Sequence, residues 1–237
     1  MLSRILAVTL PGFAIGAVMM AIAGRRVAPD ARRGRWIKFG VYFAVVHTFL
    51  AATAAGRPWI EALVAGVVVA GAIELRGATR RMQHGSPAAV WCVYVLVGTL
   101  ALVNLWRMAP AAVATLYVVV AVYDGFSQVS GQWLGRRKFS ARISPGKTVE
   151  GVGGGLVGAM LAAALLRNLV GTSLLGALAL GVGTGLAGLA GDLAASWVKR
   201  AGGIKDYSNL LPGHGGVLDR FDSFLAAAAI VGALLKI

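Results

Sequence analysis

Residues 88–106 read AAVWCVYVLVGTLALVNLW, a run of 19 residues without a charged side chain. An α-helix rises 1.5 Å per residue, so a run of about 20 apolar residues crosses the hydrocarbon core of a bilayer, which is about 30 Å thick. Seven more apolar runs of about 17–25 residues, the length range for a helical span, start near Ile5, Ile37, Trp59, Pro110, Gly151, Leu174 and Phe221. The sequence therefore predicts an all-α polytopic membrane protein with about eight transmembrane helices.

The composition agrees with this prediction. Of 237 residues, 58% are hydrophobic and only 14% are charged, which leaves too little polar surface for a water-soluble globule of this size. A soluble enzyme and a disordered chain are excluded, and the single Cys92 excludes a disulfide scaffold. Eight spans occupy about 160 positions, so no separate soluble domain is expected.

Basic residues lie mainly in every second connection between the apolar runs. The segments 24–38, 76–87, 131–150 and 196–220 hold 18 of the 23 lysines and arginines. The positive-inside rule places these connections in the cytoplasm and both chain ends outside. The net charge of +14 is therefore interpreted as a topology signal and not as a nucleic-acid surface.

Two features near the apolar runs leave alternatives open. Residues 1–23 resemble a cleavable signal peptide ending at Ala23, but one basic residue precedes the apolar run and six follow it, which is the bias of a retained span. Glycines four apart, such as Gly12 and Gly16, permit close helix packing within the chain or in a homodimer.

Acidic residues indicate where the chemistry lies. Asp124, Asp192, Asp219 and Asp222 all fall at predicted cytoplasmic ends of apolar runs. Because a carboxylate is costly inside a membrane, these positions predict one polar cavity that opens to the cytoplasm. Asp219 and Asp222 are three residues apart and share a helix face, so they need either a cation such as Mg²⁺ or paired lysines and arginines.

Groups suited to bind phosphate surround these acids. One basic segment holds Ser196, Lys199, Arg200, Lys205 and Asp206, and is followed by Pro212–Gly216, in which glycines flank His214. A second loop contains Ser144 and Lys147 within SPGKT, but Ala141 stands where a nucleotide P-loop requires glycine. We therefore predict phosphate binding without a P-loop.

These stretches resemble a known family. Residues 196–206 (SWVKRAGGIKD) and 211–222 (LPGHGGVLDRFD) are similar to the signature of the phosphatidate cytidylyltransferases, and residues 124–131 (DGFSQVSG) and 144–151 (SPGKTVEG) are similar to that family's other cytoplasmic loop. The resemblance covers about residues 120–237. It divides the chain into N-terminal transmembrane helices, residues 1–120, and a catalytic transmembrane region, residues 121–237.

The resemblance implies an activity and a set of site residues. The reaction joins CTP to phosphatidate, gives CDP-diacylglycerol and pyrophosphate, and uses Mg²⁺ held by Asp192 and Asp219. Lys199 and Arg220 join these two aspartates as expected catalytic residues. The expected substrate-binding residues are Asp124, Ser144, Lys147, Ser196, Arg200, Lys205, Asp206, His214 and Asp222. The expected location is the inner membrane of a bacterium, with the site facing the cytoplasm.

Several alternatives stay open at this point. Ala195 replaces a glutamate usual in the family, and residues 124–131 depart from its common pattern, so another lipid phosphate could be the acceptor. A CDP-alcohol phosphatidyltransferase would show Ala-Arg after Asp124-Gly125, which is absent here. A transporter would carry its acids near the membrane midplane. The sequence does not decide whether a monovalent cation is used.

Overall fold

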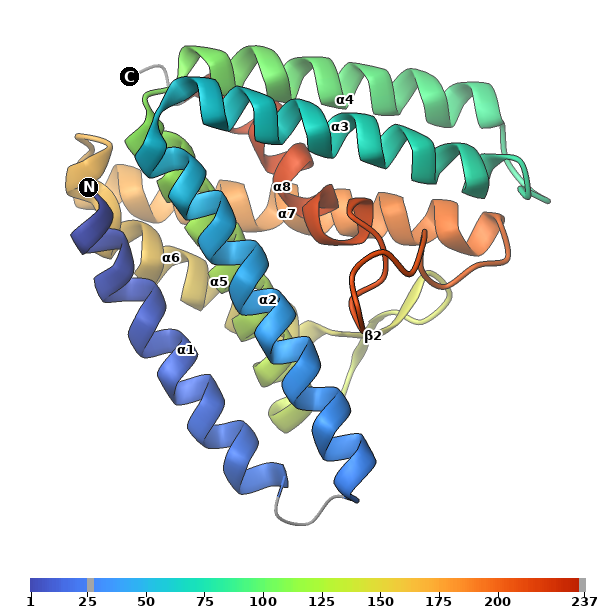
Figure 1. The fold of residues 1–237 in the computed structure, drawn as a ribbon, viewed down its shortest axis with the longest axis horizontal. Helices are drawn as coiled ribbons and strands as arrows, with labels where there is room; N and C mark the ends of the chain where they lie inside the picture. The colour runs from blue at the N-terminus through green and yellow to red at the C-terminus, as the bar shows by residue number, and fades with distance from the viewer. Residues whose placement is uncertain (25–27, 235–237) are drawn as a thin grey trace.

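The structure is a computed structural model that describes residues 1–24 and 28–234. Its helices are α1 (Leu2–Gly24), α2 (Pro29–Ala55), α3 (Arg57–Thr79), α4 (Pro87–Arg107), α5 (Pro110–Leu134), α6 (Val149–Leu166), α7 (Leu174–Ala201) and α8 (Leu218–Ile230). Short 3-10 helices cover Arg167–Leu169 and Gly232–Leu234, and two strands, β1 (Lys138–Ser140) and β2 (Ser144–Thr148), form an antiparallel hairpin. Figure 1 shows α3 and α4 side by side, with α1 and α2 extending away from them.

The prediction of an all-α polytopic membrane protein is confirmed. Within the described ranges, seven helices, α1 to α7, are long and apolar enough to cross a membrane. Six of them start within three residues of the predicted apolar runs, whereas α2 begins at Pro29, eight residues before Ile37. A proline lies in the first turn of each of α2 to α5, where the missing backbone N–H costs no hydrogen bond.

The eighth predicted span differs from the prediction. The run near Phe221 forms α8, which has only 13 residues and is therefore about 20 Å long, shorter than the hydrocarbon core. Residues 202–217, which precede α8, fold against α3, because Gly202 lies against the Ala78 carbonyl and Val217 donates to Glu74. Helix α8 then packs antiparallel to α7, with Gly191 beside Asp222 and Gly183 beside Val231. It thus starts at the polar site.

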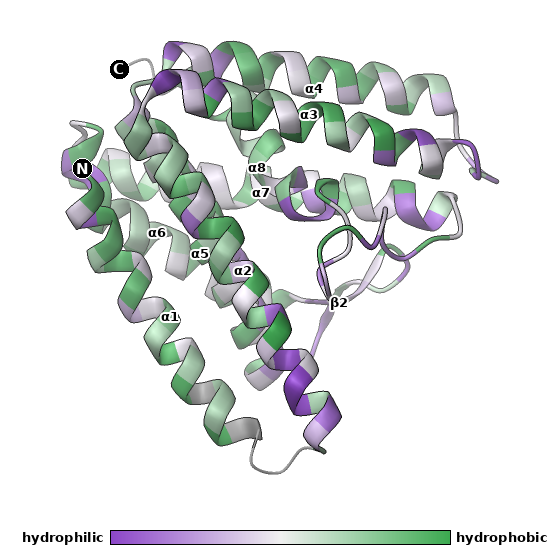
Figure 2. Ribbon diagram, in the orientation of Figure 1, coloured by the Kyte–Doolittle hydropathy of each residue, from purple (hydrophilic) through white to green (hydrophobic). Residues whose placement is uncertain are grey.

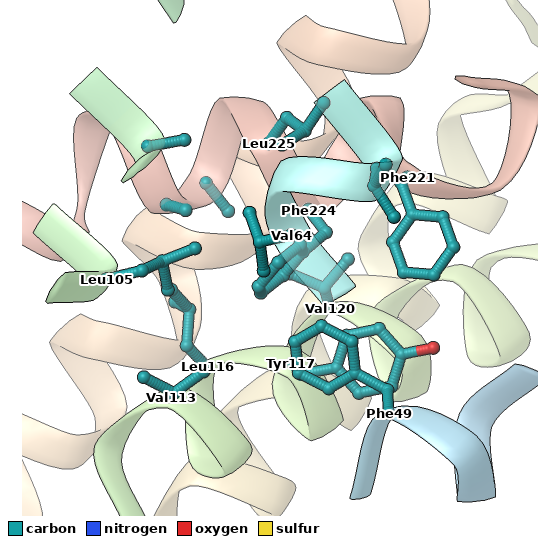
Figure 3. Packing of buried hydrophobic residues seen from close by; sticks show 14 of the residues in the cluster. Phe49, Val64, Leu105, Val113, Leu116, Tyr117, Val120, Phe221, Phe224 and Leu225 are labelled. Atoms are coloured by element: carbon teal, nitrogen blue, oxygen red, sulfur yellow. The ribbon is translucent and has the colours of Figure 1, made fainter. Parts of the chain in front are cut away.

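One cluster of buried apolar side chains joins the two halves of the chain (Figure 3). Phe49 of α2 stacks on Tyr117 of α5 with ring centroids 3.9 Å apart, and Phe224 of α8 meets both rings edge-on at 4.9 and 5.3 Å. Aromatic pairs in these arrangements add about 0.5–1.5 kcal/mol each beyond the burial of their area. The N-terminus of α8, which carries part of the site, is therefore anchored to α2 and α5.

Small residues allow α5, α6 and α7 to approach closely. A side chain at Gly155 would meet the Tyr123 carbonyl at 2.9 Å, and one at Gly181 would meet the Met160 Cα at 2.7 Å. The glycine spacing seen in α6 and α7 is thus used for packing within the chain.

Three of the four basic connections meet on one side of the molecule. Gln83, after α3, donates its backbone N–H to the Ala201 carbonyl at the end of α7 (2.9 Å), and Arg200 donates to the Ile143 carbonyl of the β-hairpin (3.4 Å). In Figure 2 the hydrophilic residues gather on this side, around β2, the end of α7 and the α3–α4 connection. Of the fourth connection, Arg25 and Arg26 lie outside the described residues.

Candidate active site

Two ion pairs lie along one face of the end of α7. Asp192, Ser196 and Lys199 follow one another at spacings of four and three, so their side chains share that face. Lys147 of β2 forms an ion pair with Asp192, and Lys199 forms one with Asp219 of α8, with Nζ and Oδ1 2.6 Å apart. The Ser196 hydroxyl donates to Asp192 Oδ1 at 3.4 Å. The structure therefore brings both predicted motif loops to one site.

Lys147 lies in a β-hairpin whose two strands are both tied to the start of α6. Thr148 begins α6 as its N-cap, because its hydroxyl accepts the Gly151 N–H at 3.0 Å. The Glu150 carboxylate accepts the N–H groups of Arg136 and Arg137 at 3.0 and 3.2 Å. Ser144 pairs with Ser140 across the hairpin, at its far end from Thr148.

Asp219 is the most enclosed acid of the site. Its side chain is 1% exposed, and besides Lys199 it accepts the backbone N–H groups of Tyr207 and Gly216, both at 2.8 Å on Oδ2. Lys199 also lies over the Tyr207 ring, 5.3 Å from its centroid. A buried charge needs such partners, because an unpaired one is strongly destabilising. Asp219 therefore fixes the segment that precedes α8.

Three further carboxylates gather beside this pair. Asp124 of α5, Asp192 of α7 and Asp222 of α8 lie close enough for their charges to repel one another, and Lys147 offsets part of that repulsion. Asp222 Oδ1 accepts the Ser223 N–H at 2.6 Å, whereas its buried Oδ2 has no hydrogen-bond partner among the residues that the structure describes. An unpartnered buried carboxylate oxygen is suited to a cation.

The donor atoms of the site are of the type that Mg²⁺ prefers. Hard carboxylate oxygens are the ligands Mg²⁺ prefers, and this ion is usually held by one or two carboxylates, waters and substrate phosphates. In the part of the chain that the structure covers, no three Asp, Glu, His or Cys residues form a ready metal cage. The expectation that Asp192 and Asp219 hold the metal stays a prediction.

His214 lies in a tight turn that reaches α2. Gly213 and Gly215 have φ values of +73° and +79°, which side-chain-bearing residues rarely adopt. The His214 ring stacks on Tyr42 with a 6.3 Å centroid separation, and its buried Nδ1 finds no hydrogen-bond partner within residues 1–24 and 28–234. Burial, followed by the charge of Arg220, lowers the pKa of His214, although a hydrogen bond to the Pro212 backbone acts in the opposite direction.

The other predicted residues occupy more open positions. Arg200 donates to the Ile143 and Ile204 carbonyls, so it ties the β-hairpin to the end of α7. Lys205, Asp206 and Arg220 are exposed. Ala195, at the position where the family usually has glutamate, is buried, and its carbonyl accepts the Tyr207 hydroxyl at 3.1 Å.

Sequence reasoning missed the role of Glu74. Among the described residues, its carboxylate accepts hydrogen bonds from the Ser208 hydroxyl and from the backbone N–H groups of Val217 and Leu218. One signal could have found it. Glu74 is an acid near the end of an apolar run, the same criterion that singled out Asp124 and Asp192.

The sequence is similar to those of known proteins. A model described as "Cytidylyltransferase family" matches residues 4–237. A phosphatidate cytidylyltransferase of Helicobacter pylori is 37% identical over 203 residues, which cover 83% of this chain and 73% of the relative. One of Pseudomonas aeruginosa is 46% identical over 148 residues, 57% and 51% of the two chains. An uncharacterized protein of Escherichia coli, YnbB, is 45% identical over 102 residues, 42% and 34%.

Proposed function

Because the chain belongs to the cytidylyltransferase family, we propose that it is a phosphatidate cytidylyltransferase of the bacterial inner membrane, with its site open to the cytoplasm. An oxygen of the lipid phosphate attacks the α-phosphorus of CTP, the bond to the β-phosphate breaks, and CDP-diacylglycerol and pyrophosphate form. The observation that carries the proposal is the meeting of Lys147 with Asp192 and of Lys199 with Asp219 in one site.

The side chains of the site suit this reaction by neutralising charge. A phosphate monoester and a triphosphate repel each other, and the attacking group belongs to the lipid, so the protein's task is to position and neutralise. Lys147 and Lys199 each have three donors and can share them between an aspartate and a phosphate oxygen. Neutral His214 supplies a ring N–H without adding charge.

Mg²⁺ completes the proposed site. When bound, it draws negative charge from the phosphate oxygens. Asp192 and Asp219 are the proposed ligands, and the unpartnered oxygen of Asp222 supports a cation close to them. Asp124, Ser144, Ser196, Arg200, Lys205, Asp206 and Arg220 remain proposed contacts for CTP and the lipid phosphate.

The reaction itself provides the first test. We expect the purified full chain in detergent, given labelled CTP, phosphatidate and Mg²⁺, to release CDP-diacylglycerol and pyrophosphate, because the site gathers the charges that the two phosphates need. Product should disappear with EDTA and return with added Mg²⁺. Thin-layer separation of the labelled lipid and a pyrophosphate assay measure both products.

The same assay separates the alternatives. A panel of other lipid phosphates tests whether the chain is a paralogue that uses a different acceptor. Ala195 in place of the family glutamate supports this alternative. If one of these lipids gives a CDP-lipid and phosphatidate does not, the acceptor proposed here is wrong. A transporter would give no CDP-lipid from any acceptor.

The proposed orientation gives a second expected result. Single cysteines at Gln83, Arg142 and Lys205, in a Cys92→Ser background, should resist an impermeant thiol reagent in intact cells, because the charge bias holds these connections inside. A cysteine at Gly171, between α6 and α7, should react and serves as the control. Labelling of the Lys205 site in intact cells would overturn the orientation.

A further inference from the structure

We infer that Glu74 of α3 is a positioning residue. It holds Asp219 and the loop before it, residues 207–217, in the geometry required for catalysis. The expected changes in activity rest on the proposed function. The expected change in the hydrogen bonds of this loop does not, and hydrogen exchange measures it separately.

The start of α8 lacks a cap of its own. Its N-cap residue, Val217, is apolar and has helical dihedral angles (φ −65°, ψ −44°), and in the described part of the chain it makes no side-chain capping hydrogen bond to the first backbone donors. Glu74 supplies the missing acceptors. Its Oε1 accepts the Val217 N–H at 3.0 Å and its Oε2 accepts the Leu218 N–H at 2.8 Å. A carboxylate at this place also interacts favourably with the helix dipole.

Glu74 also binds Ser208, near the beginning of the loop of residues 207–217. The Ser208 hydroxyl donates to Oε1 at 2.6 Å, and Ser208 in turn accepts the Leu210 N–H at 3.2 Å. Space for this arrangement comes from Gly216, where a side chain would lie 2.6 Å from the Glu74 Cδ, and from Gly71, where one would lie 3.2 Å from Leu218.

Glu74 and Asp219 divide the donors of this loop between them. Asp219 accepts the backbone N–H groups of Tyr207 and Gly216. Glu74 accepts hydrogen bonds from the residues that follow these two, Ser208 and Val217, and also from Leu218. The position of Asp219, one residue after Leu218, therefore depends on the anchor that Glu74 provides. Since Glu74 forms no hydrogen bond or ion pair with Lys199 or Asp219 among the described residues, it acts through the loop.

Glu74→Gln tests the inference, because the amide keeps one acceptor but places an NH₂ group where a second acceptor is needed. We expect kcat to fall about 10- to 100-fold with the KM for CTP changed less than about threefold, since one or two charge-assisted hydrogen bonds are lost. The Mg²⁺ concentration for half-maximal activity should rise about fivefold or more, because Asp219 is displaced. Glu74→Asp, which keeps the charge, should recover part of kcat.

Hydrogen exchange of the backbone amides, followed by mass spectrometry, gives a readout independent of activity. In Glu74→Gln the segment 207–218 should exchange at least about tenfold faster than in the unaltered protein. The matched control is Glu61→Gln, the same change at an exposed position near the other end of α3, which should alter neither exchange nor kcat. If Glu74→Gln fails to fold, Ser208→Ala, which removes one of the three bonds, should show a smaller change in the same direction.

The outcomes separate this inference from the proposed function. Unchanged exchange in Glu74→Gln, or faster exchange with unaltered kcat, overturns the positioning role. If the unaltered protein makes no CDP-lipid from any acceptor, the proposed function fails, and the exchange measurement still decides whether Glu74 anchors the loop.

Discussion

Asp192→Asn should lower turnover by at least about a thousandfold at saturating Mg²⁺. Asn has the same shape as Asp but no charge, so Lys147 loses its ion-pair partner and the proposed metal site loses a ligand. Removing one ligand from a site that must neutralise a triphosphate should cost about 4 kcal/mol of transition-state stabilisation, and each 1.36 kcal/mol is a factor of ten in rate.

The fold should tolerate this change. The Asp192 and Lys147 side chains are 27% and 15% exposed, so the lysine charge that the change leaves without its partner still reaches solvent. Asp30→Asn, an exposed acid in the first turn of α2, is the matched control and should change turnover less than about threefold. Steady-state kinetics with membrane levels of each variant measure the effect. More than one tenth of the original rate in Asp192→Asn would contradict the role of this residue.

Lys199→Met should both destabilise the protein and abolish most turnover. The Lys199 and Asp219 side chains are 10% and 1% exposed, and removing one partner of a buried ion pair costs about 3–5 kcal/mol because the other charge stays buried. The free energy of unfolding in detergent measures this loss. Arg33→Gln, at an exposed position of α2, is the control and should leave both stability and turnover nearly unchanged.

A double variant separates stability from catalysis. Lys199→Met with Asp219→Asn removes both charges, while the Asn carbonyl can still accept the Tyr207 and Gly216 N–H bonds. We expect the double variant to be more stable than Lys199→Met alone, with turnover still low, because residues in contact do not act additively. Recovery of turnover together with stability would mean that the pair serves the fold alone.

The local sequence determined seven membrane spans and the helix face that carries three of the predicted site residues. In an uncharged run such as residues 88–106, the backbone donors find acceptors within the same helix and the apolar side chains can face lipid. The structure of such a run therefore depends little on distant residues. Likewise, the spacing of Asp192, Ser196 and Lys199 along one helix places them on one face. These features could be read without the fold.

Only the tertiary structure decided which charges meet and where the last helix begins. Sequence reasoning left open whether Asp219 binds a metal or forms an ion pair. In the fold its carboxylate pairs with Lys199 and accepts two backbone N–H groups. It also brings Glu74 to Leu218, 144 residues away, which sets the start of the short helix α8. Such contacts depend on how α3, α7 and α8 pack. A carboxylate binds whichever donors the packing places within about 3 Å, and no local pattern encodes that choice.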